Sequence, residues 1–353
     1  MKIESLCMEN FMVFNSLDTR FSPQINVIFG ENSTGKTALL KMMYSVAKSL
    51  ADVNNGRGDM TIEKIEKALI DKMVGVFMPE NEVIGRLVCR QQGSNRTDIA
   101  MRLSNQDTVK MGFSNRQKRN MDLEVDTNKK IDKYVPIFIP TKEFISSTAN
   151  FTSLYEEYYI AIEETYYDLA KLLLKPLKKG KNTREQNKVL SSFSNIINGN
   201  VVQKDNKFFL KVQGAGEFEM GLVSEGYRKL STLIYLILSG SLDKNAILFW
   251  DEPESDMNPK MIGHVTEALV ELAKMGVQIF ITTHSYFVQQ SFNLLSEYPK
   301  ETKNKVDIQF MSLYKEEQDG KILCETGKTL SEIKHNAVME EFDAIYDREQ
   351  ELM

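Results

Sequence analysis

The stretch GENSTGKT, residues 30–37, has the residue types and spacing of a loop that binds nucleotide phosphates. It matches the pattern G-x-x-x-x-G-K-[ST], follows the apolar stretch INVIF and precedes apolar residues at helical spacing. Glycines let backbone N–H groups curve around phosphate oxygens, and a helix that begins near Lys36 would direct its positive end toward them. Lys36 would reach the β- and γ-phosphates, and the Thr37 hydroxyl would ligate Mg²⁺. The predicted phosphate site consists of Gly30, Glu31, Asn32, Ser33, Thr34, Gly35, Lys36, Thr37 and Ala38.

Two carboxylates follow a second apolar stretch, AILFW at residues 246–250. A buried strand there would deliver Asp251 and Glu252 to the carboxyl edge of a sheet, where ligands bind in open α/β folds. We predict that Asp251 belongs to the Mg²⁺ ligands and that Glu252 polarises an attacking water molecule. Taken alone, the pair could be an acidic turn at a strand end, but its presence beside a phosphate-binding loop favours the catalytic interpretation.

A histidine, His284, follows a third apolar stretch, VQIFITT, and lies 32 residues after Glu252. At a strand end it could contact the γ-phosphate and report its presence, or it could make only a structural hydrogen bond. His264 and His335 lie in helical patterns without metal-ligand partners, so we interpret both as surface or packing residues.

The stretch VSEGYRKL, residues 223–230, reads as the start of a helix. Ser224 is a typical N-cap residue, and the apolar side of the helix would be formed by Leu230, Leu233, Ile234 and Ile237. A helix that starts with Ser-x-Gly offers a hydroxyl, free N–H groups and a positive dipole end to an anion. The alternative is a plain capped helix with no ligand.

Strand-like and helix-like segments alternate along the chain, which predicts an α/β fold with a mixed sheet flanked by helices. Residues 151–198 interrupt this alternation with a long helical pattern that ends in KPLKKGKNTREQNK, and we interpret them as an inserted helical arm. The N-terminal and C-terminal parts of the core would be residues 1–150 and 199–305. Residues 306–353 would add a hairpin, signalled by Asp319-Gly320, and a charged helix.

Composition excludes several classes of protein. The chain has 353 residues, 42% hydrophobic and 26% charged, with a formal charge of -5, which argues against a strongly basic nucleic-acid-binding domain. Its three cysteines, Cys7, Cys89 and Cys324, indicate no disulfide framework. The N-terminus lacks the apolar core of a signal peptide, and the apolar run at 230–238 is too short to span a bilayer. We therefore expect a cytoplasmic protein without a membrane partner.

The order of these motifs resembles that of ABC-type ATPases: a P-loop, a Ser-x-Gly turn, a strand that ends in Asp-Glu, and a histidine after a strand. Within that class the chain is similar to the SMC/Rad50/RecF-like branch, and most to compact AAA15/AAA21-type proteins related to the ATPase part of OLD nucleases. The opening MKIESLCMENF and the stretch VPIFIPTKEF carry further likeness. The resemblance covers about residues 1–50, 134–148 and 199–290 and implies the P-loop NTPase fold of the ABC type.

The resemblance also implies a role for each motif. Lys36 and Thr37 would belong to Walker A, and Asp251 and Glu252 to Walker B. His284 would be the switch histidine. The signature motif, which would bind nucleotide together with the P-loop, would comprise Ser224, Glu225 and Gly226, with Arg228 following.

Three positions depart from the family's pattern. Glu225 stands where the family more often has glycine, and Arg228 and Lys229 would offset its charge and lie over the partner's nucleotide. The D-loop aspartate is expected six residues after the catalytic glutamate, where this chain has Asn258; Asp256 lies two residues earlier.

The third departure is the Q-loop turn, which has no glutamine. It holds Thr141, Lys142 and Glu143, and Glu143 is the candidate metal ligand there.

The family resemblance implies an enzyme that binds ATP and Mg²⁺ and hydrolyses ATP. Two copies would enclose two ATP molecules, each site combining the P-loop and Walker B of one chain with the Ser224 turn of the other. The leading interpretation is the sensor or regulatory subunit of a bacterial anti-phage system, a homodimer or higher oligomer that controls a separate effector such as a nuclease or toxin. DNA or a phage protein is a further candidate partner.

Other features bear on the effector. Only 69 residues follow His284, too few for a Toprim nuclease, and their acidic residues at 340–349 have helical spacing, so the effector is expected to be a separate chain. The 188 residues between Lys36 and Ser224 leave no room for a long coiled coil.

Three alternatives stay open: a RecF/Rad50-type repair ATPase that acts directly on DNA, a transporter subunit, and a scaffold that binds nucleotide without hydrolysis. The SEGYRK signature and the missing glutamine argue against a transporter, and Glu252 argues against a scaffold. Two basic clusters could contact DNA or could be solvated loops: Arg116, Lys118, Arg119, Lys129 and Lys130, and Lys175, Lys178, Lys179, Lys181 and Arg184.

Overall fold

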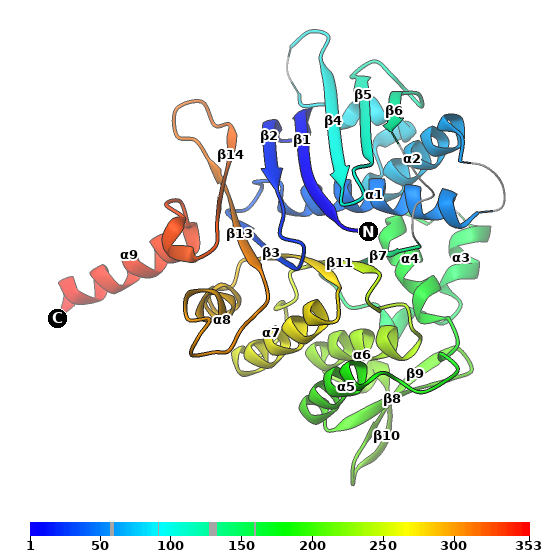
Figure 1. The fold of residues 1–353 in the computed structure, drawn as a ribbon, viewed down its shortest axis with the longest axis vertical. Coiled ribbons are helices and arrows are strands. Elements are labelled where there is room, and N and C mark those ends of the chain that lie inside the picture. Colours follow the sequence, from blue (N-terminus) through cyan, green and yellow to red (C-terminus); the bar gives the residue numbers. More distant parts are fainter. Residues whose placement is uncertain (57–59, 91, 127–132, 159) are drawn as a thin grey trace. The chain divides into compact units, whose positions relative to one another are not determined.

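The computed structural model describes residues 1–56, 60–90, 92–126, 133–158 and 160–353. The chain forms two compact units (Figure 1). Unit 1 comprises Met1–Lys133 and Phe280–Met353, and unit 2 comprises Tyr134–Ile279. One boundary falls inside strand β12 (Gln278–Thr283), which therefore contributes residues to both units. The sequence-based limits at residues 150, 198 and 305 stay predictions.

Unit 1 contains an antiparallel five-stranded sheet with the order β2-β1-β4-β5-β6. The strands are β1 (Ile3–Phe11), β2 (Phe14–Arg20), β4 (Arg96–Leu103), β5 (Thr108–Ser114) and β6 (Asp122–Asp126). Buried and exposed side chains alternate along β4, as expected for a sheet with one solvated face. Helices α1 (Lys36–Asn55) and α2 (Ile62–Phe77) pack against each other, and α2 contacts β6.

The second sheet of unit 1 carries the phosphate-binding motif. Strand β3 (Ile25–Gly30) pairs in parallel with β13 (Ile308–Lys315), which pairs antiparallel with β14 (Ile322–Gly327). The order in this unit is β14-β13-β3-β12. All six residues of β3 are buried, which explains its uninterrupted apolar sequence. The hairpin predicted at Asp319-Gly320 is confirmed as the β13–β14 connection, where Gly320 has a φ of 69°.

Two further helices complete unit 1. Helix α8 (Tyr286–Glu297) begins directly after His284, and the Ser285 side chain caps it by accepting a hydrogen bond from the Val288 N–H. Helix α9 (Ala337–Leu352) has no buried residue; its first half contacts α8, and its C-terminal end extends away from α8 and β14 (Figure 1). Short 3₁₀ helices occur at Glu80–Glu82, Ile84–Leu87 and Leu330–Glu332.

Unit 2 is built on parallel strands β7 (Val135–Ile139) and β11 (Ala246–Asp251), in the order β12-β11-β7. Its helices are α3 (Phe151–Glu157), α4 (Glu164–Leu173), α5 (Arg184–Ile197), α6 (Glu225–Leu238) and α7 (Pro259–Lys274). A separate small sheet has the order β10-β9-β8, formed by β8 (Gly199–Lys204), β9 (Lys207–Val212) and β10 (Gly216–Glu219). Short 3₁₀ helices lie at Ile145–Ser147 and Met220–Leu222.

The segment predicted as an inserted helical arm consists of three helices, α3, α4 and α5. Helix α4 contacts β7, and α5 contacts α6 and α7. A capping box formed by Thr183 and Gln186 starts α5 and ends the basic stretch before it. Helices α4 and α5 therefore lie against other elements of unit 2 and bury an apolar side there, and α3 packs on α4.

Within the ranges that the structure describes, no helix is long and apolar enough to traverse a lipid bilayer.

Candidate functional site

The predicted P-loop is a tight turn between β3 and α1 in unit 1. Gly30, Ser33 and Gly35 have φ values of 147°, 65° and 91°. A Cβ atom at Gly30 would lie 2.0 Å from the carbonyl oxygen of Leu313, and one at Gly35 would lie 2.5 Å from the Phe14 ring. Both the backbone conformation and the space therefore require glycine at these two positions.

The Lys36 side chain is turned into this loop and is only 6% exposed. Its Nζ donates to the carbonyl oxygens of Gly30 at 3.0 Å and Glu31 at 2.6 Å. The Thr34 hydroxyl donates to the same Glu31 carbonyl at 2.9 Å. Helix α1 begins here with Gly35 as its N-cap, a residue without a side chain to cap the helix. An ammonium group at the positive end of a helix, inside a glycine-rich turn, fits the phosphates of a nucleotide.

His284 follows the last residue of β12, also in unit 1, and is half-buried. The next residue, Ser285, donates its N–H to the Thr283 hydroxyl at 2.9 Å and caps α8, so the histidine lies between the end of the strand and the start of the helix. Tyr286 stacks on Phe342 of α9, with ring centroids 4.7 Å apart. The contact of His284 with a γ-phosphate stays a prediction.

The predicted carboxylates lie in unit 2, in a segment that we call the acidic loop, residues 251–258. Strands β11 and β7 run in parallel with Trp250 beside Ile139, so both strands end at the same edge. The Thr141 hydroxyl, in the predicted Q-loop turn, donates to Oδ2 of Asp251 at 3.0 Å. Burial, with the charges of Glu163 and Asp251, raises the pKa of Tyr166 to about 12.

The Glu143 carboxylate is held within the same chain. Its Oε1 accepts a hydrogen bond from the Ser146 hydroxyl at 2.6 Å and lies 2.7 Å from an Arg228 guanidinium nitrogen. The Glu143 side chain is 7% exposed and that of Arg228 is 20% exposed. In this structure Arg228 therefore pairs with Glu143, a partner that the sequence did not indicate. The metal-binding role of Glu143 and the nucleotide contact of Arg228 stay predictions.

Lys229 is directed into the acidic loop and is 1% exposed. Its Nζ donates to the Ser255 carbonyl at 2.8 Å and to the Ser255 hydroxyl. The Ser255 hydroxyl in turn donates to the Thr141 carbonyl at 3.3 Å. Burial lowers the pKa of Lys229, and four carboxylates oppose this effect: Asp256, Glu225, Glu254 and Glu252. Burying an ammonium group costs several kcal/mol unless such partners compensate.

The predicted helix start at Ser224 is confirmed, since Ser224 is the N-cap of α6, and its role as a signature motif stays a prediction. The Ser224 side chain is exposed and makes no capping hydrogen bond. A Cβ atom at Gly226 would lie 3.4 Å from Met257 and 3.5 Å from the Asp256 carbonyl oxygen, so the first turn of α6 packs on the acidic loop. The predicted apolar side of the helix is buried: Leu230, Leu233, Ile234 and Ile237.

The acidic loop contains two left-handed residues that are not glycine. Glu252 has a φ of 47° and Asp256 a φ of 62°. Each such residue costs on the order of 1 kcal/mol or more, and it persists where its surroundings hold it. Asn258, at the expected D-loop position, is the N-cap of α7, and its side chain accepts a hydrogen bond from the Lys260 N–H.

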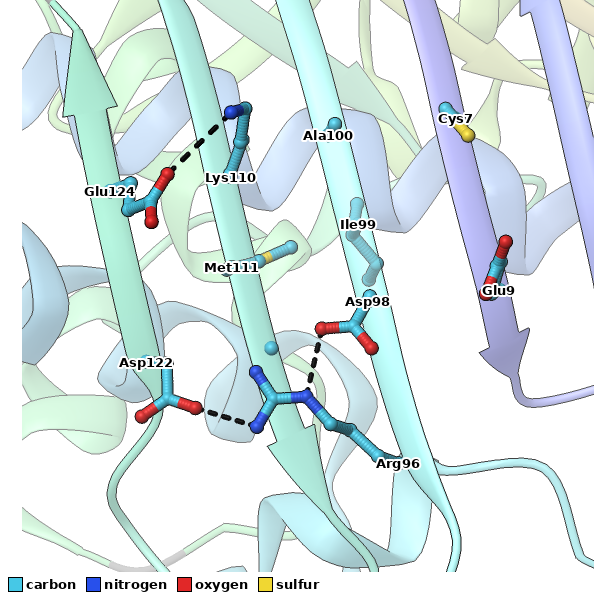
Figure 2. Close-up of a pocket in the computed structure, with 11 residues that line it drawn as sticks. Cys7, Glu9, Arg96, Asp98, Ile99, Ala100, Lys110, Met111, Asp122 and Glu124 are labelled. Carbon is cyan, nitrogen blue, oxygen red and sulfur yellow. Dashed lines mark hydrogen bonds and ion pairs between the residues drawn. The ribbon is translucent and has the colours of Figure 1, made fainter.

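A hollow of about 460 Å³ lies on the exposed face of the five-stranded sheet (Figure 2). Arg96 crosses β5 there, between Asp98 at 2.8 Å and Asp122 at 2.6 Å. Gly112 makes room for it, because a Cβ atom at that position would lie 2.1 Å from the guanidinium group. None of the predicted site residues lines this hollow. Its charged lining consists of four carboxylates and two cations: Glu9, Asp98, Asp122, Glu124, Arg96 and Lys110.

A second hollow, of about 440 Å³, adjoins Gly30 and Glu31. Tyr314 and His335 line it and stack on each other with ring centroids 3.9 Å apart. His335 Nδ1 lies 2.7 Å from the Glu325 carboxylate. His335 is thus a packing residue, as predicted, although it lies just before α9 and not within a helix.

Among the described residues, no three His, Cys, Asp or Glu side chains are arranged to hold a metal ion. Mg²⁺ is usually held by one or two carboxylates with water and substrate phosphates, so the oxygen atoms of Asp251 and Thr37 are donors of the expected kind. Their role as magnesium ligands stays a prediction.

A family model described as "AAA domain, putative AbiEii toxin, Type IV TA system", AAA_21, matches residues 25–288. The chain belongs to the AAA_21 family. The matched range includes the P-loop, the Ser224 turn, the acidic loop and His284.

Curated relatives of this AAA_21 chain include the "DNA replication and repair protein RecF" of Lacticaseibacillus casei (strain BL23), 31% identical over 99 residues. That match covers 28% of this chain and 23% of the relative. The protein of the same name from Listeria welshimeri is 42% identical over 57 residues, 16% of this chain and 15% of the relative. The chain thus spans less than a quarter of the length of these relatives.

Two solved structures resemble almost the whole chain. One is an Smc head bound to the C-winged helix domain of ScpA, with a TM-score of 0.54 and 12% identity over 93% of this chain and 98% of that one. The other is an Smc head with an extended coiled coil bound to a ScpA domain from Pyrococcus furiosus, with a TM-score of 0.53 and 10% identity over 98% and 99%. At these identities the likeness shows the fold. The predicted fold class is confirmed, and the family match, the short RecF matches and the Smc head fold together support the predicted likeness to ABC-type ATPases of the SMC/RecF kind.

Proposed function

We propose that this AAA_21 protein binds ATP with Mg²⁺, hydrolyses it, and changes its assembly state with the bound nucleotide. The P-loop carries the proposal: a buried Lys36 ammonium lies inside a turn whose glycines leave no room for side chains, at the start of α1. Such a turn binds phosphate through backbone N–H groups and one cation.

Hydrolysis would use the groups that the sequence predicted. Phosphoryl transfer to water needs charge neutralisation and positioning more than covalent help from the protein. Asp251 and Thr37 would hold Mg²⁺, Glu252 would align the water molecule, and His284 would contact the γ-phosphate. Glu143 is the weaker metal candidate because Ser146 and Arg228 already engage its carboxylate.

Two copies would associate around nucleotide, with the Ser224 turn of each chain facing the ATP of the other. Two observations support this: the Ser224 side chain is exposed, and it makes no capping bond with its own helix. An exposed helix start with an unused hydroxyl can accept an anion from outside its own chain.

In the cell, we propose a cytoplasmic sensor or regulatory subunit of an anti-phage system that controls a separate nuclease or toxin. The family description refers to a toxin and to a type IV toxin–antitoxin system, and such systems are built from more than one protein. The Smc heads of similar fold were solved with a bound partner domain, which supports a protein partner.

The test compares the wild type with Glu252→Gln and with Lys36→Ala. We expect Glu252→Gln to reduce kcat on the order of 100-fold or more while retaining ATP, because the group that orients water is lost and the P-loop is intact. Light scattering should then find a stable ATP-dependent dimer of this variant. Lys36→Ala should bind ATP at least about tenfold more weakly and stay monomeric. Full turnover by Glu252→Gln would contradict the proposed mechanism.

The RecF relatives favour a second candidate, a repair ATPase that acts directly on DNA. Within the first basic cluster, Arg119 is paired with Asp71 and Glu82, and Lys129 and Lys130 lie outside the described residues. The sheet face in Figure 2 carries more carboxylates than cations and offers no evident phosphate site.

The two candidates differ in one measurement. ATP turnover would be followed with and without duplex or gapped DNA at two salt concentrations. A stimulation that disappears at high salt supports the repair ATPase, since phosphate contacts are salt-sensitive. No effect of DNA supports the regulatory subunit.

A further inference from the structure

We propose that Lys229 is a positioning residue for Glu252: by holding Ser255, it fixes the conformation of the acidic loop that directs the Glu252 carboxylate. The inference rests on the proposed hydrolysis of ATP with Glu252 as the group that aligns water. It concerns unit 2 alone, where all the residues involved lie.

The acidic loop needs an external support. Its two left-handed residues, Glu252 and Asp256, lie on either side of Ser255. Ser255 donates its N–H to the Glu252 carbonyl at 3.2 Å, and Met257 donates to the Glu254 carbonyl at 2.9 Å. Strained residues keep such a conformation only when neighbouring groups hold it.

Lys229 supplies that support by binding Ser255. Its ammonium bonds both the carbonyl and the hydroxyl of Ser255, three positions after Glu252. Because two bonds reach one residue from one cation, the orientation of the Ser255 peptide is defined as well as its position.

The support continues from Ser255 to the end of β11. The Ser255 hydroxyl donates to the Thr141 carbonyl at 3.3 Å, and the Thr141 hydroxyl donates to Asp251 at 3.0 Å. The middle of the loop and its first residue are therefore tied to the same turn. Glu252 lies between these two attached points.

Helix α6 presents Lys229 from a rigid base. Leu230 and Leu233, which follow it, are completely buried, and Arg228 before it is paired with Glu143. Gly226 brings the first helical turn against Met257, at the far end of the loop. The backbone of Lys229 is therefore held in place, as are the Ser255 atoms that its ammonium group binds.

A purely space-filling role does not explain a lysine here. An apolar side chain of equal length would fill the same volume without the cost of burying a charge. It could not hold the Ser255 carbonyl and hydroxyl, and it would leave four nearby carboxylates without this cation: Glu225, Glu252, Glu254 and Asp256.

The test is Lys229→Met in the full chain, with Lys244→Met as a matched control. Lys244 is exposed and precedes β11, at the opposite end of that strand from the acidic loop. We expect Lys229→Met to reduce kcat about 10- to 100-fold, because a displacement near 1 Å at a reacting group can have such an effect. The KM for ATP should change less than about threefold, because the P-loop belongs to unit 1. Lys244→Met should leave both constants within about twofold of the wild type.

Tryptophan fluorescence separates positioning from misfolding. The chain has one tryptophan, Trp250, which is completely buried and directly precedes Asp251. An unchanged emission maximum in Lys229→Met, together with the fall in kcat, supports the proposal. A shifted maximum, or equal changes of kcat and KM, would indicate a structural role and overturn it.

A second variant covers the case in which Lys229→Met does not fold. Ser255→Ala removes one of the two acceptors of Lys229 and keeps the carbonyl. It should lower kcat about three- to tenfold with an unchanged KM. Unchanged kcat in a folded Ser255→Ala or Lys229→Met, alongside an active wild type, overturns this inference alone. A wild type without ATP turnover overturns the proposed function and this inference together.

Discussion

The P-loop of unit 1 and the acidic loop of unit 2 both connect a completely buried strand to a helix, but they are constructed differently. The P-loop is held mainly by local backbone groups. Lys36 donates hydrogen bonds to carbonyl groups five and six residues before it, and the positive φ angles of Gly30 and Gly35 bend the chain. The acidic loop is held by side chains from distant segments, with Lys229 reaching 26 positions to Ser255 and Thr141 reaching 110 positions to Asp251.

This difference predicts opposite sensitivities. A loop made of backbone should be sensitive to added Cβ atoms and tolerant of most side-chain changes. A loop held by side chains should be sensitive to the loss of a single charge or hydroxyl. Substitutions in the two regions can test this contrast.

The largest effect is expected for Gly35→Ala. The residue would be strained at a φ of 91°, and its Cβ would lie 2.5 Å from the Phe14 ring. We expect the free energy of unfolding to fall by about 2–4 kcal/mol and ATP affinity to fall at least about tenfold, as measured by urea unfolding and nucleotide titration. Gly93→Ala is the control, since its φ is 96° but nothing lies within 4 Å, and it should lose only about 1 kcal/mol. Equal losses would show that space at Gly35 is unimportant.

An intermediate effect is expected for Arg228→Met in unit 2. The substitution leaves the Glu143 carboxylate, 7% exposed, without its cation. The free energy of unfolding should fall by about 1–2 kcal/mol, because the Arg228 side chain is still partly solvated, and adding Glu143→Gln should restore about 0.5–1 kcal/mol. Thermal or urea unfolding of Arg228→Met, Glu143→Gln and the double variant gives the coupling free energy between the two side chains. Additive effects of the two substitutions would mean that the ion pair does not stabilise the turn that contains Glu143.

The smallest effect is expected for Ser33→Gly in the P-loop. Ser33 is exposed and has a φ of 65°, a conformation that glycine adopts without strain. Relief of strain and the greater freedom of the unfolded chain oppose each other, so stability should change by less than about 0.5 kcal/mol. ATP affinity, measured by titration, should stay within about twofold. A large loss of affinity would show that the Ser33 side chain, and not only the backbone, forms the site.

The same contrast explains what the sequence could predict. The P-loop, the buried strands INVIF and AILFW, the N-cap at Ser224 and the hairpin at Asp319-Gly320 are local patterns, and each was predictable because its physical cause lies within a few residues.

Contacts between distant segments were not predictable from such patterns. The pairings of Arg228 with Glu143 and of Lys229 with Ser255 depend on how α6 is placed against the segments that follow β7 and β11 in the folded unit. Strand β6 was not predicted, because the surrounding sequence is polar. The helices of residues 151–198 were predicted, but their packing on β7, α6 and α7 was not.

The parallel pairing of β3 with β13 has a consequence for the order of folding. It joins residues near both extremes of the chain, and the adjacent hydrogen bond from the Asp307 N–H to Gln24 spans 283 positions. Closing a loop of this length costs entropy and slows folding, and on the ribosome the contact must wait until the second partner has been synthesised. Unit 2 is continuous in sequence, so it can mature first. The curve at Gly30, which rests on the Leu313 carbonyl, therefore cannot be completed until Leu313, 283 positions further along the chain, has been synthesised.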